Sequence, residues 1–424
     1  MDYPNTFYAA EIDAGKPPEP LTRHLQADVC IIGGGLAGIS TGLELARRGQ
    51  GVVILEAHRA GWGASGRNGG IVSSGFALES EQLFQTAGKD DAWKLFGLSV
   101  AGQQYVRSQI ERFNMNGVIQ GEGCYLVSRR HALDEMQQLV EFYGQNLGRE
   151  LTFVPTELVR DTLVTTRYHQ AVYDASAFHI QPLKYALELL HQFELLGGFF
   201  FEQSRANGIR QDGGQWRVYT TNGSVKAGHV VLCTSAYDLS IFRKATRAVL
   251  PVSTYVTATE PDDGLLDEAI KTRAAVVDTR RAGDYYRRLA DGRLIWGGRI
   301  STRTEPPSQM AEKLLGDAYA VYRKLGTLKP AFVWSGLMGY ARHKMPLIGQ
   351  PEARIWVATA FGGHGLNTTA MAGQLLSRAI AEGDDEYRLF ERFGFLRAGG
   401  PFRRAAVQAS YWAMQARDKL EETF

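Results

Sequence analysis

Cysteine is scarce in this chain of 424 residues. The three that occur, Cys30, Cys124 and Cys233, cannot build a disulfide framework, and Cys30 and Cys233 lie in apolar runs typical of buried strands. We therefore expect a protein of a reducing compartment, the cytoplasm.

Long apolar runs and an excess of one charge are also missing. No stretch supplies the roughly 18 uninterrupted apolar residues that a membrane span needs, and the polar start of the chain contains no apolar signal core. The 47 basic and 45 acidic residues are spread along the chain, so we expect no nucleic-acid partner and no attachment to an anionic membrane. Repeats, low-complexity tracts and metal ligands are not predicted. What remains is a globular chain, long enough for two interleaved domains and suited to small-molecule chemistry.

A strand, a glycine turn and a helix form the first strongly patterned segment. Residues 27–32 are a short apolar run, Gly33, Gly35 and Gly38 follow, and residues 39–48 carry apolar side chains at helical spacing. In a dinucleotide-binding fingerprint, one glycine makes the turn, one lets the backbone approach the pyrophosphate, and one packs the helix against the strand. The helix N-terminus then faces the phosphates.

A second strand completes this βαβ unit. The β-branched run at 52–55 stops at Glu56, eighteen positions after Gly38, where a carboxylate can bind ribose hydroxyls. A solvated strand end is the alternative for Glu56, and its context favours the ribose role. The predicted dinucleotide contacts in this unit are Gly33, Gly35, Leu36, Ala37, Gly38, Glu56 and Ala57.

Residues 61–70 contain five glycines, which is too dense for an ordinary loop. The backbone of this segment is expected to pass close to a flat ligand. Ser65 and Arg67 offer donors to a phosphate or to the edge of a flavin ring, although Arg67 is equally consistent with a structural ion pair. The predicted cofactor contacts here are Ala64, Ser65, Arg67, Asn68, Gly69 and Gly70.

A third glycine-rich turn, at 362–365, lies between a predicted strand at 355–360 and a predicted helix at 366–381. Its backbone N–H groups and the helix dipole suit the negative charge of a reduced flavin. His364 is a catalytic candidate, with a satisfied core histidine as the alternative. The predicted cofactor contacts at this turn are Gly363, His364, Gly365 and Leu366.

The rest of the chain predicts interleaved segments. Amphipathic helical spacing runs from 80 to 149 and indicates an insertion that leaves the nucleotide sheet. Short strands at 199–233 return to that sheet. Strands at 252–260, 285–289 and 293–296 predict a second, antiparallel sheet.

Several of these segments occur together in a known family. They are Tyr8-Ala9-Ala10, residues 61–70, Cys233 to Tyr237, Gly363-His364-Gly365, and a tail from Pro401 to Leu420 that contains Ser410-Tyr411-Trp412. Over nearly its whole length the chain resembles the D-amino-acid oxidase superfamily of FAD-dependent oxidoreductases, and within it the gamma-glutamylputrescine oxidases.

The resemblance implies bound FAD and a role for each part of the site. Glu56 would bind the adenosine ribose, and the backbone of Ala206 would touch adenine. Thr234 and Gly336 would be further FAD contacts. The residues implied to line the isoalloxazine are Ser65, Asn68, Gly69 and Gly70.

The predicted fold class is α/β, or α+β overall. It consists of a Rossmann-type FAD-binding domain with an interleaved antiparallel-sheet substrate domain, of the glutathione-reductase-like FAD/NAD(P)-binding type. The resemblance implies that the second sheet roofs the flavin. The predicted segments are 1–27 as an N-terminal extension, 28–80, 165–237 and 336–385 as the FAD-binding domain, 81–164 and 238–335 as the substrate domain, and 386–424 as a C-terminal helical tail.

Departures from the family pattern lie between residues 334 and 349. Glycine oxidase and its relatives place an arginine there that clamps the substrate carboxylate, and sarcosine oxidases place the cysteine that attaches FAD, whereas this chain has Met338. We therefore expect non-covalent FAD and a substrate without an α-carboxylate. Ala341 and His343 stand where many members have Thr and Asp, which leaves the local flavin contacts open.

The expected reaction is hydride transfer from a small amine, similar to gamma-glutamylputrescine, to flavin N5, followed by hydrolysis of the imine. Tyr285 and Tyr286 have opposite parity on one strand, so only one of them can face the flavin. Together with His364 they are the catalytic candidates. The predicted substrate pocket is lined by Trp62, Tyr255, Arg299, Trp334 and Met338.

Two alternatives to an amine oxidase stay open. The lysine that helps oxygen react in sarcosine oxidase is replaced here near Ile295, which favours a dehydrogenase that passes electrons to a quinone or a carrier. The second alternative is a non-catalytic protein that keeps FAD as part of its structure.

Overall fold

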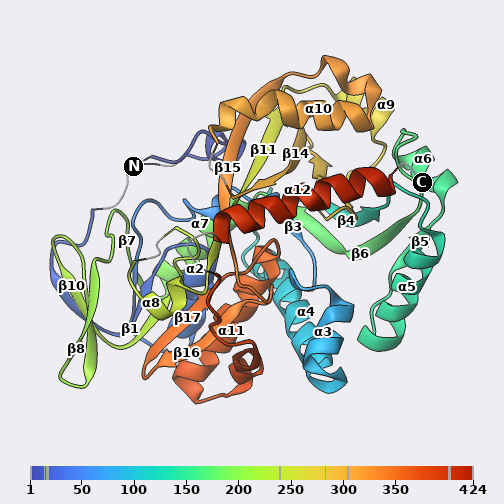
Figure 1. Ribbon diagram of the computed structural model, residues 1–424. Helices are drawn as coiled ribbons and strands as arrows, with labels where there is room; N and C mark the ends of the chain where they lie inside the picture. The colour runs from blue at the N-terminus through green and yellow to red at the C-terminus, as the bar shows by residue number, and fades with distance from the viewer. Residues whose placement is uncertain are drawn as a thin grey trace.

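Two β-sheets and the helices around them make up the molecule (Figure 1). The computed structural model describes residues 2–13, 15, 19–237, 240–281, 283–302, 305–399 and 403–422. Residue 238, predicted to begin a substrate-domain segment, and Pro401, where the family likeness of the tail begins, lie outside this set.

The first sheet is mostly parallel and has the strand order β16-β17-β10-β1-β2-β7. Neighbours from β17 to β7 run parallel, the edge strand β16 is antiparallel to β17, and the hairpin β8-β9 pairs antiparallel with β10. The bounds are β1 His24–Ile32, β2 Val52–Leu55, β7 Phe199–Phe201, β8 Gly208–Asp212, β9 Gln215–Tyr219, β10 Ser224–Leu232, β16 Leu347–Glu352 and β17 Ile355–Thr359. The re-entry of β10 beside β1 makes this layer discontinuous in sequence, as predicted.

The strands of the first sheet are apolar because both faces are covered. Ile31 and Ile54 point to one face and pack against three helices, whereas Cys30 and Val53 point to the other, where the β8-β9 hairpin lies. The three helices are α2 (Leu36–Arg47), α7 (Pro182–Leu195) and α11 (Gly365–Glu382).

The second sheet is mostly antiparallel and has the order β15-β11-β14-β13-β12-β4-β6-β3, with β5 paired to β6. Only the pair β12 and β4 runs parallel among these described strands. The bounds are β3 Ile71–Val72, β4 Ile119–Val127, β5 Thr152–Val154, β6 Ala171–Ile180, β11 Leu250–Thr259, β12 Ala275–Asp278, β13 Tyr285–Arg288, β14 Leu294–Ser301 and β15 Pro330–Tyr340.

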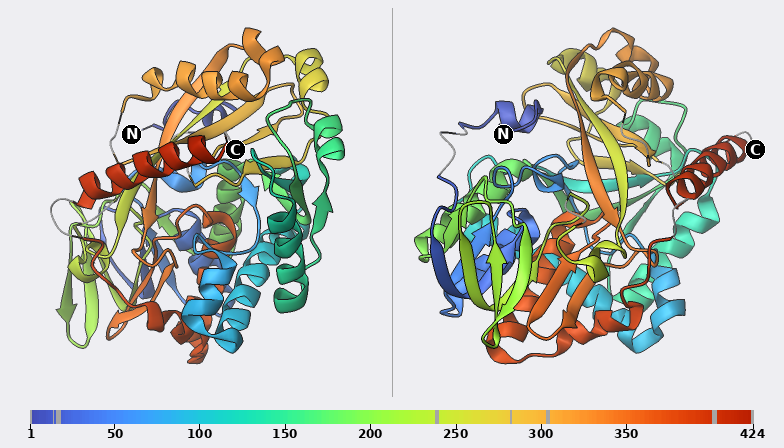
Figure 2. Two further views of the ribbon diagram at one scale, coloured as in Figure 1. Left: turned by 45° about the vertical axis from the view of Figure 1, so that its right-hand side comes forward. Right: turned by 60° about the vertical axis from the view of Figure 1, so that its left-hand side comes forward.

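The two faces of the second sheet have different neighbours. One face, which carries Tyr255 and Tyr286, packs against α9 (Asp263–Ala269) and α10 (Ala311–Val321). The opposite face carries Tyr285 and Trp334, and it packs against the N-terminal segment and α7. Figure 2 shows α9 and α10 on the side of this sheet that lies away from the first sheet.

The remaining helices surround the two sheets (Figures 1 and 2). The longest of them, α4, packs against α11 and α3. None of the described helices combines the length and the apolar character that a membrane crossing requires. The bounds are α1 Phe7–Ala10, η1 Ala64–Gly66, α3 Ser80–Ala87, α4 Lys89–Arg112, α5 Leu133–Leu147, α6 Thr156–Thr162, α8 Arg243–Thr246, η2 Pro307–Gln309, η3 Arg323–Thr327 and η4 Glu386–Phe393.

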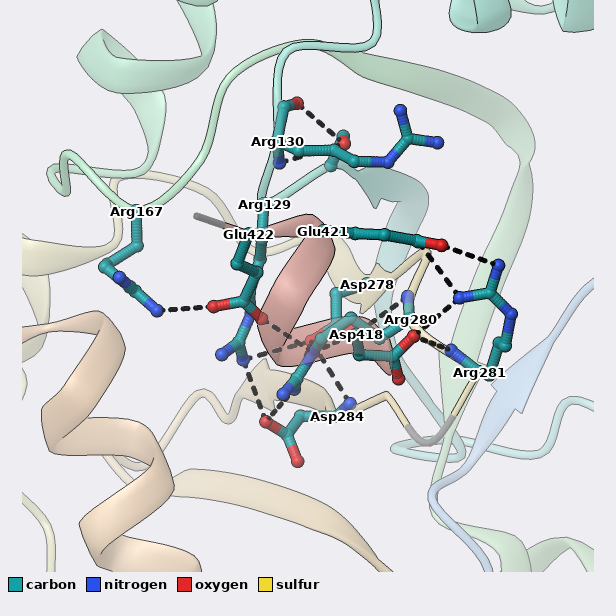
Figure 3. Close-up of polar contacts among 11 residues, drawn as sticks. Arg129, Arg130, Arg167, Asp278, Arg280, Arg281, Asp284, Asp418, Glu421 and Glu422 are labelled. Atoms are coloured by element: carbon teal, nitrogen blue, oxygen red, sulfur yellow. Dashed lines mark hydrogen bonds and ion pairs between the residues drawn. The ribbon is translucent and has the colours of Figure 1, made fainter. Parts of the chain in front are cut away.

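The last helix, α12 (Arg403–Glu421), lies along the outside of the second sheet (Figure 1). Arg281 Nη1 lies 2.9 Å from the buried Asp418 carboxylate, and Glu421 also pairs with Arg281 (Figure 3). At the other end of the helix, the Gln408 side chain accepts a hydrogen bond from Ser301 at 3.1 Å. The tail is therefore attached at two places to the second sheet.

The predicted fold class is confirmed, but three boundaries differ from the sequence prediction. The region predicted as helical from 80 to 149 contains a strand, β4. The sequence did not predict it, because the strand is mostly half-buried and its residues do not alternate between apolar and polar. β3 and β6 lie in the second sheet, although residues 28–80 and 165–237 were predicted to belong to the FAD-binding domain. The predicted boundary at residue 336 falls inside β15, which belongs wholly to the second sheet.

Candidate cofactor and substrate site

The carboxyl ends of β1, β2, β10 and β17 open on one edge of the first sheet. β1 lies between β2 and β10, so the order of the strands reverses at its end. In open α/β sheets, ligands bind in the crevice at such a reversal. The three predicted glycine-rich segments all begin at or beside this edge.

The turn after β1 has no room for side chains. A Cβ at Gly33, where φ is +111°, would lie 2.6 Å from the Cys233 carbonyl oxygen, and a Cβ at Gly38 would overlap the Gly33 carbonyl. A Cβ at Gly35 would lie 2.8 Å from Ser65 Oγ. Helix α2 then begins at an N-cap glycine, Gly35, which has no side chain to cap it. This geometry leaves bare backbone and a helix N-terminus for an anionic group.

Glu56 follows β2 at the same edge. Its Oε2 accepts the N–H of Gly34 at 2.7 Å and its Oε1 accepts the N–H of His58 at 2.8 Å, and burial raises the pKa of this carboxyl. Each oxygen keeps a lone pair for a ribose hydroxyl. The Ser204 N–H donates to the Glu56 carbonyl, which brings the loop of buried Ala206 alongside.

The other dinucleotide contacts predicted from the fingerprint lie on this edge as well. Leu36 and Ala37 form the buried first turn of α2, and the Gly33 turn abuts the backbone of Thr234 after β10. Ala57 follows Glu56 and is half-buried.

Asn68 folds the loop of residues 61–70 onto itself. Its Nδ2 donates to the carbonyls of Ala64 and Ser65, at 3.1 and 2.8 Å, and its Oδ1 accepts the Gly70 N–H at 2.8 Å. Ser65 Oγ accepts the Leu36 N–H at 2.9 Å, so its hydroxyl hydrogen is left to donate to a ligand. The side chain of Asn68 therefore shapes the loop, while that of Ser65 ties the loop to α2.

Arg67 lies between two aromatic rings. Its guanidinium carbon is 4.1 Å from the Trp62 ring centroid and 5.8 Å from that of Tyr237. Nε donates to the Trp62 carbonyl and Nη1 to the Ser335 carbonyl, at 2.8 and 3.2 Å, but Nη2 is buried without a partner. Burial lowers the pKa of Arg67. In the described part of the chain no carboxylate pairs with it, so the structural ion pair considered for Arg67 is not formed.

Tyr285 lies over the loop at Gly69. A Cβ at Gly69 or at Gly297 would overlap the tyrosine ring, so both glycines are required for this contact. The Tyr285 hydroxyl is hydrogen-bonded to the Thr254 side chain, and burial raises the pKa of the phenol, which stays protonated.

Tyr286 points away from this edge. Its ring stacks on Trp296 with centroids 4.4 Å apart, and its hydroxyl lies 2.5 Å from that of Tyr322. Strand alternation places it in the core beneath α10, so the prediction of a catalytic role for Tyr286 is wrong.

One face of β15 borders the loop of residues 61–70. Trp334 Nε1 donates to the Arg67 carbonyl at 2.9 Å, and a Cβ at Gly336 would lie 3.7 Å from Arg67 Cβ. Tyr340 packs at the far end of the strand against the turn after β17. Because side chains alternate along a strand, Met338 shares this face with Trp334 and Tyr340.

Two predicted pocket residues lie on the other face of the second sheet. Tyr255 is fully buried beneath α10, and its hydroxyl accepts the Glu305 N–H at 2.8 Å. Both Nε and Nη2 of Arg299 lie 2.6 Å from the Asp317 carboxylate of α10. The prediction that these two side chains line the pocket is therefore wrong. Trp62 remains at the edge, half-buried beside Arg67.

The turn after β17 places His364 at the N-cap of α11, with Gly363 before it and Gly365 and the buried Leu366 after it. The side chain of His364 makes no capping hydrogen bond to this helix, which leaves the amides of its first turn to a ligand. Burial lowers the pKa of His364 to about 4, so the imidazole is neutral at neutral pH. Such a group can donate a hydrogen bond without carrying charge.

Sequence reasoning missed three residues at this edge. The Tyr237 ring makes a cation–π contact with Arg67, and the Tyr340 hydroxyl is hydrogen-bonded to the Gly363 backbone. Arg287 Nε donates to the Gly69 carbonyl at 2.8 Å. Arg287 shares the parity of Tyr285, which is the signal that would have found it. Among the described residues no group of histidine, cysteine or acidic side chains is arranged to hold a metal ion.

These observations fit a bound dinucleotide. The glycine turn after β1 has no room for side chains, a half-buried carboxylate follows β2, and Arg67 Nη2 is buried without an acceptor. Residues 28–379 match the model of the family described as FAD dependent oxidoreductase, DAO, and the chain belongs to this family. It is therefore an FAD-dependent oxidoreductase.

Relatives with curated names extend over most of the chain. Gamma-glutamylputrescine oxidoreductase of Escherichia coli is 28% identical over 99% of this chain and 99% of its own length. Probable oxidoreductase OrdL of Haemophilus influenzae is 30% identical, over 88% of this chain and 87% of its own.

Solved structures show the same fold. Glycine oxidase from Geobacillus kaustophilus superposes with a TM-score of 0.73 at 20% identity, covering 85% of this chain and 96% of that one. L-proline dehydrogenase from P. horikoshii gives a TM-score of 0.72 at 18% identity, covering 87% and 99%.

Proposed function

We propose that this protein oxidises the C–N bond of a small amine that lacks an α-carboxylate, similar to gamma-glutamylputrescine. The observation that carries the proposal is Met338, which stands on the face of β15 beside Trp334 and Arg67. A methionine there offers no bidentate partner to a carboxylate. The name of the Escherichia coli relative, gamma-glutamylputrescine oxidoreductase, supports the same substrate class.

Another arginine that reached the pocket could take the place of the missing clamp, and the positions of Arg299 and Arg342 argue against this. Arg299 is held by Asp317 on the far face of the second sheet, and Arg342 is exposed. Neither is arranged to replace the arginine that stands at the Met338 position in glycine oxidases.

The FAD would be held by the residues at the carboxyl edge of the first sheet. The turn at Gly33 to Gly38 and the N-terminus of α2 would bind the pyrophosphate, Glu56 the ribose, and residues 61–70 the isoalloxazine. The bound FAD would supply the hydride acceptor. Tyr285, with its protonated hydroxyl, would line the substrate side of the ring. The neutral His364 side chain and the first amides of α11 would face the ring from the turn after β17.

The cofactor is proposed to be non-covalent. None of the three cysteines lies on β15, Cys30 and Cys233 are buried, and burial raises the pKa of both thiols. Acid precipitation of the purified protein should therefore release FAD into the supernatant. Flavin that stays with the precipitated chain would show a covalent link.

The substrate class is tested by anaerobic reduction of the bound flavin. Putrescine derivatives and monoamines should reduce it at least about tenfold more efficiently than glycine, sarcosine or D-alanine, because a charge-assisted clamp is worth about 1.5–3 kcal/mol. Met338→Arg should narrow or reverse this preference, with Met345→Leu in the buried core as the control. Faster reduction of the wild type by the amino acids would assign the protein to the amino-acid oxidases.

A dehydrogenase is the second candidate. Ile295 is fully buried on the face of the second sheet that carries Trp334 and Tyr285, and it provides no cation to assist oxygen. Turnover with an artificial dye that far exceeds turnover with oxygen would favour the dehydrogenase, and equal rates would favour the oxidase.

A further inference from the structure

Arg287 is a buried cation at the joint between the two sheets. Its side chain belongs to β13, and the whole residue is 1% exposed. All five N–H groups of the guanidinium have acceptors. These are the Gly69 carbonyl for Nε, Gln120 Oε1 and His179 Nδ1 for Nη1, and the Tyr8 hydroxyl and Ile180 carbonyl for Nη2, at 2.8, 2.7, 2.9, 3.0 and 3.0 Å.

Every one of these acceptors is neutral. Arg287 can only donate, so His179 Nδ1 accepts, and Nε2 must carry the hydrogen that it gives to the Arg273 carbonyl at 2.7 Å. Burial and the charge of Arg287 lower the pKa of His179 to about 3, which keeps the ring neutral. Burial also raises the pKa of Tyr8, so its hydroxyl stays protonated.

The neighbouring Arg288 shows how a buried arginine is ordinarily accommodated. It is 2% exposed, points to the opposite face of the sheet, and lies 2.6 Å from Asp267 and 3.3 Å from Asp263. In the part of the chain that is described, no carboxylate lies within 4.0 Å of the Arg287 nitrogens, and the exposed Glu11 interacts with this charge only at longer range. An unpaired buried charge is costly, so its retention calls for a partner that carries negative charge when the protein works.

The place of Arg287 identifies that partner. The guanidinium lies directly behind the loop proposed to line the isoalloxazine: it binds the Gly69 carbonyl, and a Cβ at Gly70 would lie 2.7 Å from Nη2. A reduced flavin carries negative charge at neutral pH, and fixed positive charge nearby stabilises it. The low dielectric of the interior preserves this effect through the loop.

We propose that Arg287 is a positioning and electrostatic residue that raises the reduction potential of the bound FAD. It acts through the loop and contacts neither the ring nor the substrate. The proposal rests on the proposed function, because it takes the isoalloxazine to lie over Gly69 and Gly70.

The decisive variant is Gln120→Glu. It keeps the shape and the hydrogen bond at Nη1 but gives Arg287 a counter-charge. The potential of the bound FAD, measured by equilibration with reference dyes, should fall by at least about 30 mV, which is a tenfold change in a two-electron equilibrium. Arg287→Gln should also lower the potential. Arg287→Lys keeps the charge and should change the two-electron equilibrium constant by less than threefold.

Arg288→Gln is the matched control, because it removes an equally buried guanidinium from the other face. Its potential should equal that of the wild type even if the protein melts earlier. An unchanged potential in Gln120→Glu, or an equal fall in Arg288→Gln, would show that Arg287 only clamps the loop, while the proposed function would stand. A wild-type protein that binds no FAD would refute both.

Discussion

Gly35 brings the start of α2 so close to Ser65 that even one carbon atom is excluded. The added Cβ would lie 2.8 Å from Ser65 Oγ, which accepts the Leu36 N–H at 2.9 Å. A side chain here would also occupy the approach of the pyrophosphate to the backbone.

Gly35→Val should therefore abolish retention of FAD through purification. The measurement is the flavin absorbance per mole of protein. Gly97→Ala is the control, because Gly97 lies in α4 with no atom within 4 Å of an added Cβ and should keep its FAD. Normal flavin content in Gly35→Val would contradict the dinucleotide interpretation of this turn.

His179 links the stability of the fold to pH. Its pKa of about 3 in the folded protein lies below the value of about 6.5 expected in the unfolded chain. Between these values the unfolded chain binds more protons, so stability falls as the pH falls from 6.5 towards 3.

Between pH 7 and pH 5 this residue should cost about 2 kcal/mol of unfolding free energy. Chemical unfolding at the two pH values measures the loss, and His179→Gln, whose amide can still donate to the Arg273 carbonyl, should lose less. The exposed His191 serves as the comparison, since His191→Gln should behave as the wild type. Equal slopes in all three proteins would refute a neutral, buried His179.

At the scale of the elements, α12 is attached to the second sheet by side chains near both of its ends. Arg281 and Asp418 connect its C-terminal half to the second sheet (Figure 3). Gln408 connects its N-terminal half to Ser301. The family match ends at residue 379, so this helix lies beyond it, although the Escherichia coli relative aligns over 99% of the chain.

Asp418→Asn should loosen α12 without unfolding the sheets, because it removes the charge of the one buried carboxylate on that helix that pairs with Arg281. Hydrogen exchange should increase several-fold in residues 403–422 and remain unchanged in β1 and β10. Arg417→Gln, at an exposed position, should leave both regions as they are. Unchanged exchange in the Asp418 variant would mean that the ion pair does not hold the helix.

The elements near the first glycine turn were predictable because their signals are local. The apolar runs of β1 and β2 and the spacing from Gly38 to Glu56 depend on residues that are neighbours in sequence. The same holds for β17 and α11 around the turn at 362–365.

The substrate side was less predictable, because which side chains line the pocket depends on which face of the second sheet the helices cover. Parity separates Tyr285 from Tyr286 in the sequence, but only the packing of α10 shows which one is turned to the core. Arg299 has a positive φ of 56° and turns to Asp317, a contact that no local pattern indicates. Parity places Arg287 and Arg288 on opposite faces of β13, but the surroundings of each side chain come from distant segments that no local pattern indicates.

At the scale of the whole molecule, the site lies where the two sheets meet. The contacts of the loop of residues 61–70 with the second sheet include Trp334 Nε1 on the Arg67 carbonyl, the Tyr285 ring on Gly69, and Arg287 on the Gly69 carbonyl. A ligand bound against this loop contacts both sheets and should stabilise the chain as one unit.

The central claim is that the FAD held at this joint accepts electrons from an amine, and the absorbance of the bound flavin under anaerobic conditions tests it most directly. Addition of gamma-glutamylputrescine or a related amine should bleach the oxidised flavin band within one turnover, and admission of oxygen or a dye should restore it. If dithionite bleaches the flavin but no amine or amino acid does, the FAD is a structural component and the account of an amine-oxidising enzyme is wrong.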